Sequence, residues 1–279
     1  MSIDVLQNKI RKLKNPSALV LAPMADQIPE ELGLESYCIG LLETLRELIG
    51  AVRVDPTAFL LLDGGVEALS AVLKRAKELG YYVILDWTRV ESPVQAKYSS
   101  QQILQGERWP CDAAVISGYA GTDTIKHWFK ATANKKDLFV LVKTANKSGA
   151  EVQDLQNGGR FVYTAGADLA SWMGENAIER CGYSRIGVVA GAYNAASLRT
   201  LRTNYPRTFL IVDGVDETGC NAKNVSYAFD KLGHGALVCA SHSIFAAWKE
   251  AEAGTDPVAA AVEAAERMKR NITRYVTVL

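Results

Sequence analysis

Short runs of apolar residues recur along the chain at intervals of a few tens of residues. They are rich in valine, isoleucine, leucine and alanine, and they do not alternate with polar residues, so both faces of each predicted strand must be covered. This pattern is typical of a parallel sheet flanked by helices. The predicted strands are Ala18–Ala22, Ala51–Val54, Tyr82–Asp86, Ala113–Ser117, Leu138–Lys143, Ile186–Ala190, Thr208–Val212 and Gly235–Cys239.

Between these strands, apolar residues recur at spacings of three and four, which predicts amphipathic helices. The first two helices each stop at a glycine, a third begins with an asparagine suited to capping, and the last has proline in its first turn. The predicted helices are Ser36–Ile49, Val66–Leu79, Asn224–Leu232 and Asp256–Arg270.

Strands that alternate with helices over 279 residues favour a (β/α)₈ TIM barrel, which has about 250 residues in its usual form. The alternative is an open, doubly wound parallel sheet. We find no linker and no low-complexity segment, so residues 1–279 are assigned to a single domain. The glycine-containing segment Asn146–Ala167 is expected to be a loop inserted over the mouth of the barrel.

The composition is that of a globular protein, with 48% hydrophobic and 22% charged residues. Lys and Arg together number 31, as do Asp and Glu, so no basic surplus indicates a nucleic acid or a membrane as partner. The five cysteines form no C-x-x-C pair, and the N-terminal residues lack the order of a signal peptide. We therefore expect a cytoplasmic protein with reduced thiols and a small-molecule or protein partner.

Several segments carry a resemblance to one enzyme family. They are Ser2–Asp4 with Asn15-Pro16, the stretch Phe139–Asn146 followed by Gln153–Leu155, and Gly182–Ser184 before Gly187–Ala192. In this order they resemble orotidine 5'-phosphate decarboxylase of the longer bacterial type. The resemblance implies a TIM barrel, a homodimer with sites near the subunit interface, a role in pyrimidine biosynthesis and no cofactor.

The family's catalytic motif, D-x-K-x-x-D after the third strand, corresponds to Asp86–Glu91. Asp86 keeps the first aspartate, Thr88 stands at the lysine position, and Glu91 replaces the second aspartate. A second family lysine, which precedes a proline after strand two, corresponds to Asp55. The resemblance thus assigns these four residues to the catalytic positions, with most of the working groups replaced.

The implied substrate-binding positions are also altered. Ala22 stands where the family has an aspartate that contacts the ribose, whereas Thr144 and Asn146 follow the family pattern. The phosphate loop corresponds to residues 214–220 and includes Gly214 and Thr218, and His242 replaces the arginine that grips the phosphate. The resemblance therefore implies weak binding of a nucleotide monophosphate.

These replacements predict strongly impaired or absent decarboxylation. A lysine between carboxylates can stabilise a developing carbanion and donate a proton to it, and a threonine hydroxyl can do neither. Lys97 lies beyond the strand end, and Lys143 lies within a strand that also has a helix-facing side, so we expect neither to substitute. The mouth of the barrel is predicted to be acidic, from Asp55, Asp86, Glu91, Asp213, Asp216 and Glu217.

Simpler interpretations remain open for these residues. Asp86 could be a structural hydrogen-bonding residue, and Glu91 a solvated loop charge. Asp213, Asp216 and Glu217 could bind Mg²⁺ or Ca²⁺ through oxygen ligands, or could form a solvated acidic loop. Three functions therefore remain open. They are a decarboxylase with strongly impaired activity, a non-catalytic barrel that binds another ligand or a protein partner, and a divalent-metal-dependent barrel lyase.

Overall fold

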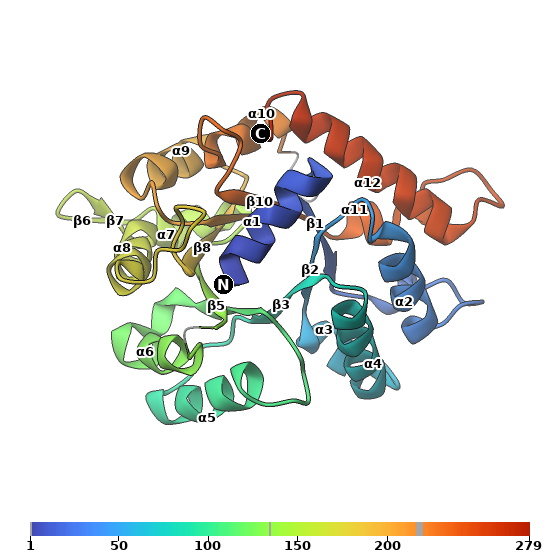
Figure 1. Ribbon diagram of the computed structural model, residues 1–279, viewed down its shortest axis with the longest axis horizontal. Helices are drawn as coiled ribbons and strands as arrows, with labels where there is room; N and C mark the ends of the chain where they lie inside the picture. Colours follow the sequence, from blue (N-terminus) through green and yellow to red (C-terminus); the bar gives the residue numbers. More distant parts are fainter. Residues whose placement is uncertain (1, 134, 216–219) are drawn as a thin grey trace.

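The computed structural model describes residues 2–133, 135–215 and 220–279. Within these ranges the parallel strands close into a barrel whose order is β1-β10-β9-β8-β5-β4-β3-β2, with helices around it (Figure 1). This confirms the TIM-barrel prediction. The strands are β1 (Ser17–Leu21), β2 (Ala51–Val54), β3 (Tyr82–Trp87), β4 (Ala113–Ser117), β5 (Asp137–Lys143), β8 (Ile186–Gly191), β9 (Leu210–Asp213) and β10 (Ala236–Ala240).

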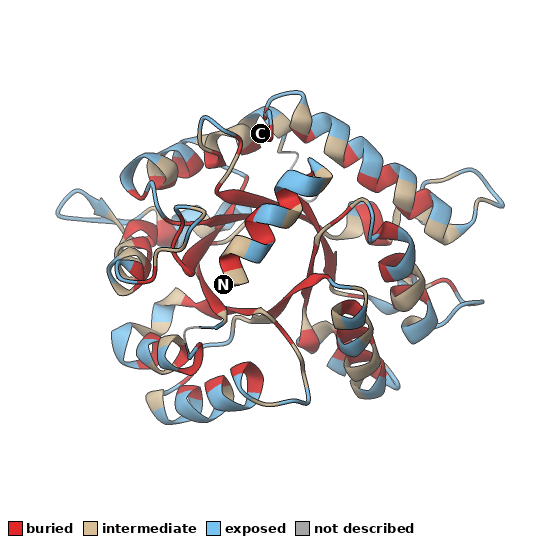
Figure 2. Cartoon of the chain, viewed as in Figure 1, coloured by how far each residue is buried: buried red, intermediate tan, exposed pale blue. Residues whose placement is uncertain are grey.

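The strands are buried almost throughout, and helices surround them (Figure 2). The predicted bounds of β2 and β4 coincide with the observed ones, and those of the remaining strands differ by one or two residues at one or both ends. Unbroken apolar runs located these strands because a parallel strand with two covered faces has few positions for polar residues.

The longer helices bury one face against the barrel and expose the other to solvent (Figure 2), and the buried residues are mostly apolar. Their ends follow local chemistry: Ser92 forms a capping box with Gln95 before Pro93 begins α5, and Asp256 caps α12. These helices are α2 (Leu34–Leu45), α4 (Gly65–Glu78), α5 (Pro93–Leu104), α6 (Thr122–Ala131), α8 (Val162–Gly174), α9 (Ala195–Asn204) and α12 (Pro257–Thr273).

The predicted helix Asn224–Leu232 is wrong. The structure has a one-turn helix α10 (Ala222–Val225) and then a 3₁₀ turn at Ser226–Ala228. Asn221 is the N-cap, because its side chain accepts the backbone N–H of Asn224 at 3.0 Å. Asp230 then accepts the N–H groups of Leu232 and His234, both at 2.8 Å, so the chain turns where helical periodicity alone predicted continuation.

The segment Asn146–Ala167 contains regular structure. A 3₁₀ turn (Lys147–Gly149) leads into α7 (Ala150–Gln153), a hairpin of β6 (Gln156–Asn157) and β7 (Arg160–Phe161) follows, and α8 then begins. Figure 1 shows the hairpin projecting outward at the rim of the molecule.

The N-terminal helix α1 (Ser2–Leu13) lies across one end of the barrel (Figure 1). Asp4 accepts the N–H of Cys181 at 2.8 Å, and Gln7 accepts the N–H of Gly235 at 3.1 Å. Cys181 and Gly235 precede β8 and β10, so α1 covers the end of the barrel at which the strands begin. We call this end the base. The C-terminal strand ends therefore form the mouth at the opposite end. Within the described ranges, no helix is both long and apolar enough to cross a membrane.

Candidate active site at the mouth of the barrel

The centre of the mouth is an arginine on a barrel strand. Arg53, on β2, is 5% exposed. Its Nε donates to Oδ2 of Asp86 at 2.9 Å, its second terminal nitrogen also pairs with Asp86, and NH1 donates to Oδ2 of Asp213 at 2.9 Å. Asp86 lies near the end of β3 and Asp213 at the end of β9, so one guanidinium joins three strands.

The electrostatics of this cluster keep Arg53 charged. Burial lowers the pKa of its guanidinium, but the carboxylates of Asp213 and Asp86 outweigh that effect and raise the pKa well above its usual value. Below them, the thiol of Cys239 is buried, and burial raises its pKa to about 12. Oδ1 of Asp86 is buried and accepts no hydrogen bond from the described residues. The cluster is therefore an ion-paired floor beneath the mouth.

Arg53 changes the interpretation of the acidic mouth. Asp86 and Asp213 do lie at strand ends, as predicted, but both point to a cation that the sequence analysis overlooked. A signal was present: Arg53 is the one charged residue in the apolar strand Ala51–Val54, and a charge buried between two covered faces needs a partner. The partners lie 33 and 160 positions away in the chain.

Glu91 is not the solvated charge that the simpler interpretation assumed. It is 5% exposed, and its Oε1 accepts hydrogen bonds from Ser99 Oγ at 2.7 Å and from Trp87 Nε1 at 3.1 Å. Trp87 is the last residue of β3, and Ser99 lies on α5. The carboxylate of Glu91 is therefore held between the strand end and the following helix, while Thr88, between Asp86 and Glu91 in sequence, is half-buried.

Asp55 caps a helix. Its side chain accepts the N–H of Thr57 at 2.8 Å at the start of α3 (Pro56–Leu60). Burial, and secondarily the nearby charge of Asp86, raises the pKa of Asp55 above its usual value. The position that resembles a family lysine thus holds a capping carboxylate.

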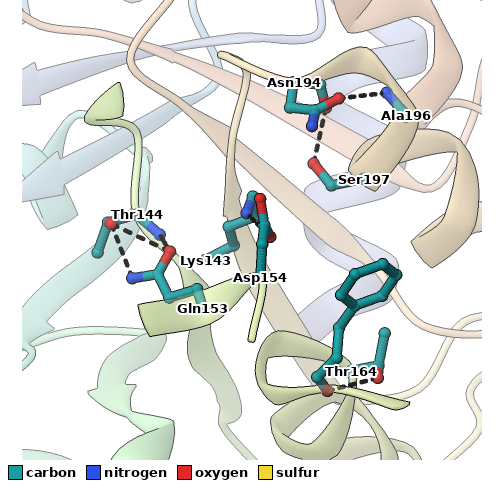
Figure 3. A network of polar contacts seen from close by, with 9 residues as sticks. Lys143, Thr144, Gln153, Asp154, Thr164, Asn194, Ala196 and Ser197 are labelled. Carbon is teal, nitrogen blue, oxygen red and sulfur yellow. Dashed lines mark hydrogen bonds and ion pairs between the residues drawn. The ribbon is translucent and has the colours of Figure 1, made fainter. Parts of the chain in front are cut away.

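The two lysines considered as substitutes lie elsewhere. Lys97 is exposed on α5. Lys143, at the end of β5, is 5% exposed and forms an ion pair with Asp154 (Figure 3). Its ammonium also lies 4.9 Å from the centre of the Tyr163 ring on α8. Its ammonium is thus held beside α7 and α8.

Thr144 is fixed by a reciprocal contact with Gln153 of α7 (Figure 3). The amide oxygen of Gln153 accepts the Thr144 N–H at 3.0 Å, and its amide nitrogen donates to Thr144 Oγ1 at 2.8 Å. Asn146 is exposed and donates to Ser148 at 2.9 Å. Thr144 is thus held at the strand end, whereas Asn146 contacts its own turn.

The region that resembles a phosphate site is only partly described. Gly214 has φ 72°, and its N–H donates to Oδ1 of Asp213 at 3.2 Å. His242, after β10, has its Nδ1 2.9 Å from the side-chain amide of the buried Gln27. Ala22 is half-buried after β1. Thr218 lies outside the described residues.

Of the three residues considered as ligands of a divalent metal, only Asp213 lies in the described part of the chain. Asp216 and Glu217 lie outside it, and no group of three or more His, Cys, Asp or Glu side chains able to hold a metal occurs among the described residues. Asp213 accepts a hydrogen bond from Arg53.

The chain is similar to several known proteins, although no family model matches it. It is 28% identical over 243 residues to orotidine 5'-phosphate decarboxylase of Rhodopirellula baltica, covering 82% of this chain and 80% of the relative. It is 30% identical over 192 residues to the Clostridium novyi enzyme of that name, covering 68% and 66%. The solved structure of Leishmania donovani UMP synthase superposes with a TM-score of 0.79 at 26% identity, covering 98% of this chain and 56% of that one.

Proposed function

The chain belongs to the orotidine 5'-phosphate decarboxylase family, and from this premise we propose that it retains the barrel but has lost the decarboxylation chemistry. The family connects the chain with pyrimidine biosynthesis. The observation that carries the proposal is the ion-paired floor, in which Arg53 joins Asp86 and Asp213 while a neutral Thr88 occupies the position of the family's lysine.

Arg53 supplies a positive charge beside Asp86, but it is unsuited to donate a proton to the substrate. Decarboxylation leaves a carbanion-like centre, and the group that protonates it should have a pKa near the working pH. The neighbouring carboxylates raise the pKa of Arg53 well above its usual value. Arg53 therefore balances the buried carboxylates, and its guanidinium nitrogens already contact both Asp86 and Asp213.

Phosphate binding is weakened by the same arrangement. Asp213 presents a carboxylate at the start of the loop that resembles the phosphate site. Arg53 balances only one of the two carboxylates that it contacts, so the cluster keeps a net negative charge that repels a phosphate. His242 contacts Gln27 and lacks the permanently charged fork of an arginine. A nucleotide monophosphate should therefore bind weakly.

Thermal shift with UMP and with Mg²⁺ tests this proposal, because a ligand raises the melting temperature only if it binds the folded state. We expect no stabilisation by millimolar UMP. Stabilisation at micromolar UMP would contradict the loss of the nucleotide site, and stabilisation by Mg²⁺ alone would instead favour the metal-dependent lyase.

We also propose a homodimer. Four strongly exposed apolar residues follow β3 or lie at the end of α3, with exposed fractions of 67–81%. Large apolar side chains that are this exposed favour burial against a partner. The residues are Leu61, Val90, Val94 and Tyr98.

Light scattering tests the dimer. The unmodified chain should have twice the mass of 30.3 kDa at micromolar concentration, and Val94→Asp with Tyr98→Asp should give monomers. A monomeric unmodified chain would refute this part of the proposal, which is separate from the loss of catalysis.

A further inference from the structure

A groove lies between α5 and α6 on the outside of the barrel, apart from the mouth residues described above. It has a volume of about 540 Å³. Polar side chains from both helices face it, and none of its lining residues is acidic. Its lining includes Lys97, Gln101 and Gln105 from α5, or just after it, and Lys126, His127 and Lys130 from α6.

The groove concentrates positive charge in a chain that has no net charge. Lys97, Lys126 and Lys130 are exposed, and none of them forms an ion pair with a described residue. Lys126 and Lys130 are four positions apart on one helix, a spacing that destabilises a helix when the charges are alike. The α5 sequence has no acidic residue, and the α6 sequence has only Asp123, in its first turn. A binding partner would supply the missing negative charge.

The spacing of these groups matches an extended chain. Lys97, Gln101 and Gln105 recur every four residues, which places them about 6 Å apart along the axis of a helix. Lys126 and Lys130 repeat that spacing on the facing helix. Alternate residues of an extended peptide are about 7 Å apart, so acidic side chains at every second position can meet successive lysines.

Gln101 favours a peptide over a small inorganic anion, because a glutamine amide both donates and accepts hydrogen bonds, as a peptide backbone does. The side-chain nitrogen of Gln105 already donates to the carbonyl oxygen of Ala131 at 3.2 Å, so Gln105 offers a partner its amide oxygen. A polyphosphate offers acceptors only. The lysines, as flexible point charges, suit carboxylates without requiring a fixed bidentate geometry.

We infer that the α5–α6 groove binds an extended acidic peptide segment of a partner protein, with carboxylates at alternate positions. The groove does not include the residues of the mouth, so the inference holds whether or not the chain decarboxylates orotidine 5'-phosphate.

Fluorescence anisotropy with a labelled peptide that alternates Glu and Ser over nine residues tests this inference on the full chain. We expect binding at low salt that weakens as salt is added, because the contacts are between exposed charges. Lys126→Gln with Lys130→Gln should weaken binding about tenfold or more, and a change of that size is readily resolved. Lys and Gln have similar helix propensities, so the fold should persist.

The matched control is Lys74→Gln with Lys231→Gln, which removes the same charge at exposed lysines outside the groove. It should leave binding within about twofold, since screened, distant charges contribute little. Failure of the peptide to bind, equal loss in both double variants, or tighter binding of tripolyphosphate than of the peptide would each overturn the inference.

Discussion

The two ends of the barrel bury carboxylates in opposite ways. At the mouth, Asp86 lies against Arg53. At the base, Asp137 of β5 is 0% exposed and accepts a hydrogen bond from the hydroxyl of Tyr82, and its Oδ1 accepts none from the described residues. Burial raises the pKa of Asp137 to about 7, and the Tyr82 hydrogen bond opposes that rise only in part.

The comparison shows how much a direct ion pair matters to a buried acid. Asp86 contacts a guanidinium, whereas at Asp137 burial outweighs the Tyr82 hydrogen bond and the nearby charge of Arg185, and the neutral acid is competitive near pH 7. The mouth therefore holds a fixed ion cluster, whereas the base, covered by α1, holds a group that titrates near neutrality.

The largest effect should come from removing the cation at the mouth. Arg53→Met would leave Asp86 facing Asp213 without a counter-charge, and breaking a buried pair in this way typically costs about 3–5 kcal/mol. Urea unfolding at pH 7 measures the change in the free energy of unfolding. Adding Asp86→Asn to Arg53→Met should recover part of the loss. Equal destabilisation of the single and double variants would show that Arg53 acts through packing alone.

A pH-dependent effect should follow from Asp137. Between about pH 4 and pH 7 the folded state holds a proton on Asp137 that the unfolded state has lost, so this group's contribution to stability falls as pH rises. Asp137→Asn removes the titration. Relative to the unmodified chain, the variant should therefore gain stability from pH 5 to pH 8, on the order of a few kcal/mol.

Melting temperatures of both chains across this pH range measure the difference. Tyr82→Phe is the informative companion, because loss of its hydrogen bond should raise the pKa of Asp137 further and move the window to higher pH. Parallel pH profiles for the unmodified chain and Asp137→Asn would contradict the titration at the base.

The smallest effect should come from the cap at the mouth. Asp55→Ala removes the acceptor for the Thr57 N–H and should destabilise the chain by about 1 kcal/mol. Asp55→Asn keeps the cap, and chemical denaturation should distinguish the two. If the asparagine variant lost as much stability as the alanine variant, the charge of Asp55 rather than its hydrogen bond would matter.

The barrel could be predicted from sequence because its strands are apolar on both faces, as Ala113–Ser117 illustrates. The position of Asp86 and Asp213 at the mouth could be predicted, because both residues lie at the C-terminal ends of barrel strands. Arg53 was missed because its partners are distant in sequence, and Glu91 because its burial depends on Ser99 and Trp87 folding over it. The predicted helix Asn224–Leu232 failed where side chains of the turn compete for backbone N–H groups.

Direct measurement of orotidine 5'-phosphate turnover, with protein free of the host enzyme, tests the central claim that decarboxylation is lost. We expect no turnover above the uncatalysed rate. Thr88→Lys alone should remain nearly inactive, because the energy of binding the phosphate also contributes to the chemical step, and Thr88→Lys with His242→Arg should exceed the product of the separate effects. Robust turnover by the unmodified chain would contradict the account.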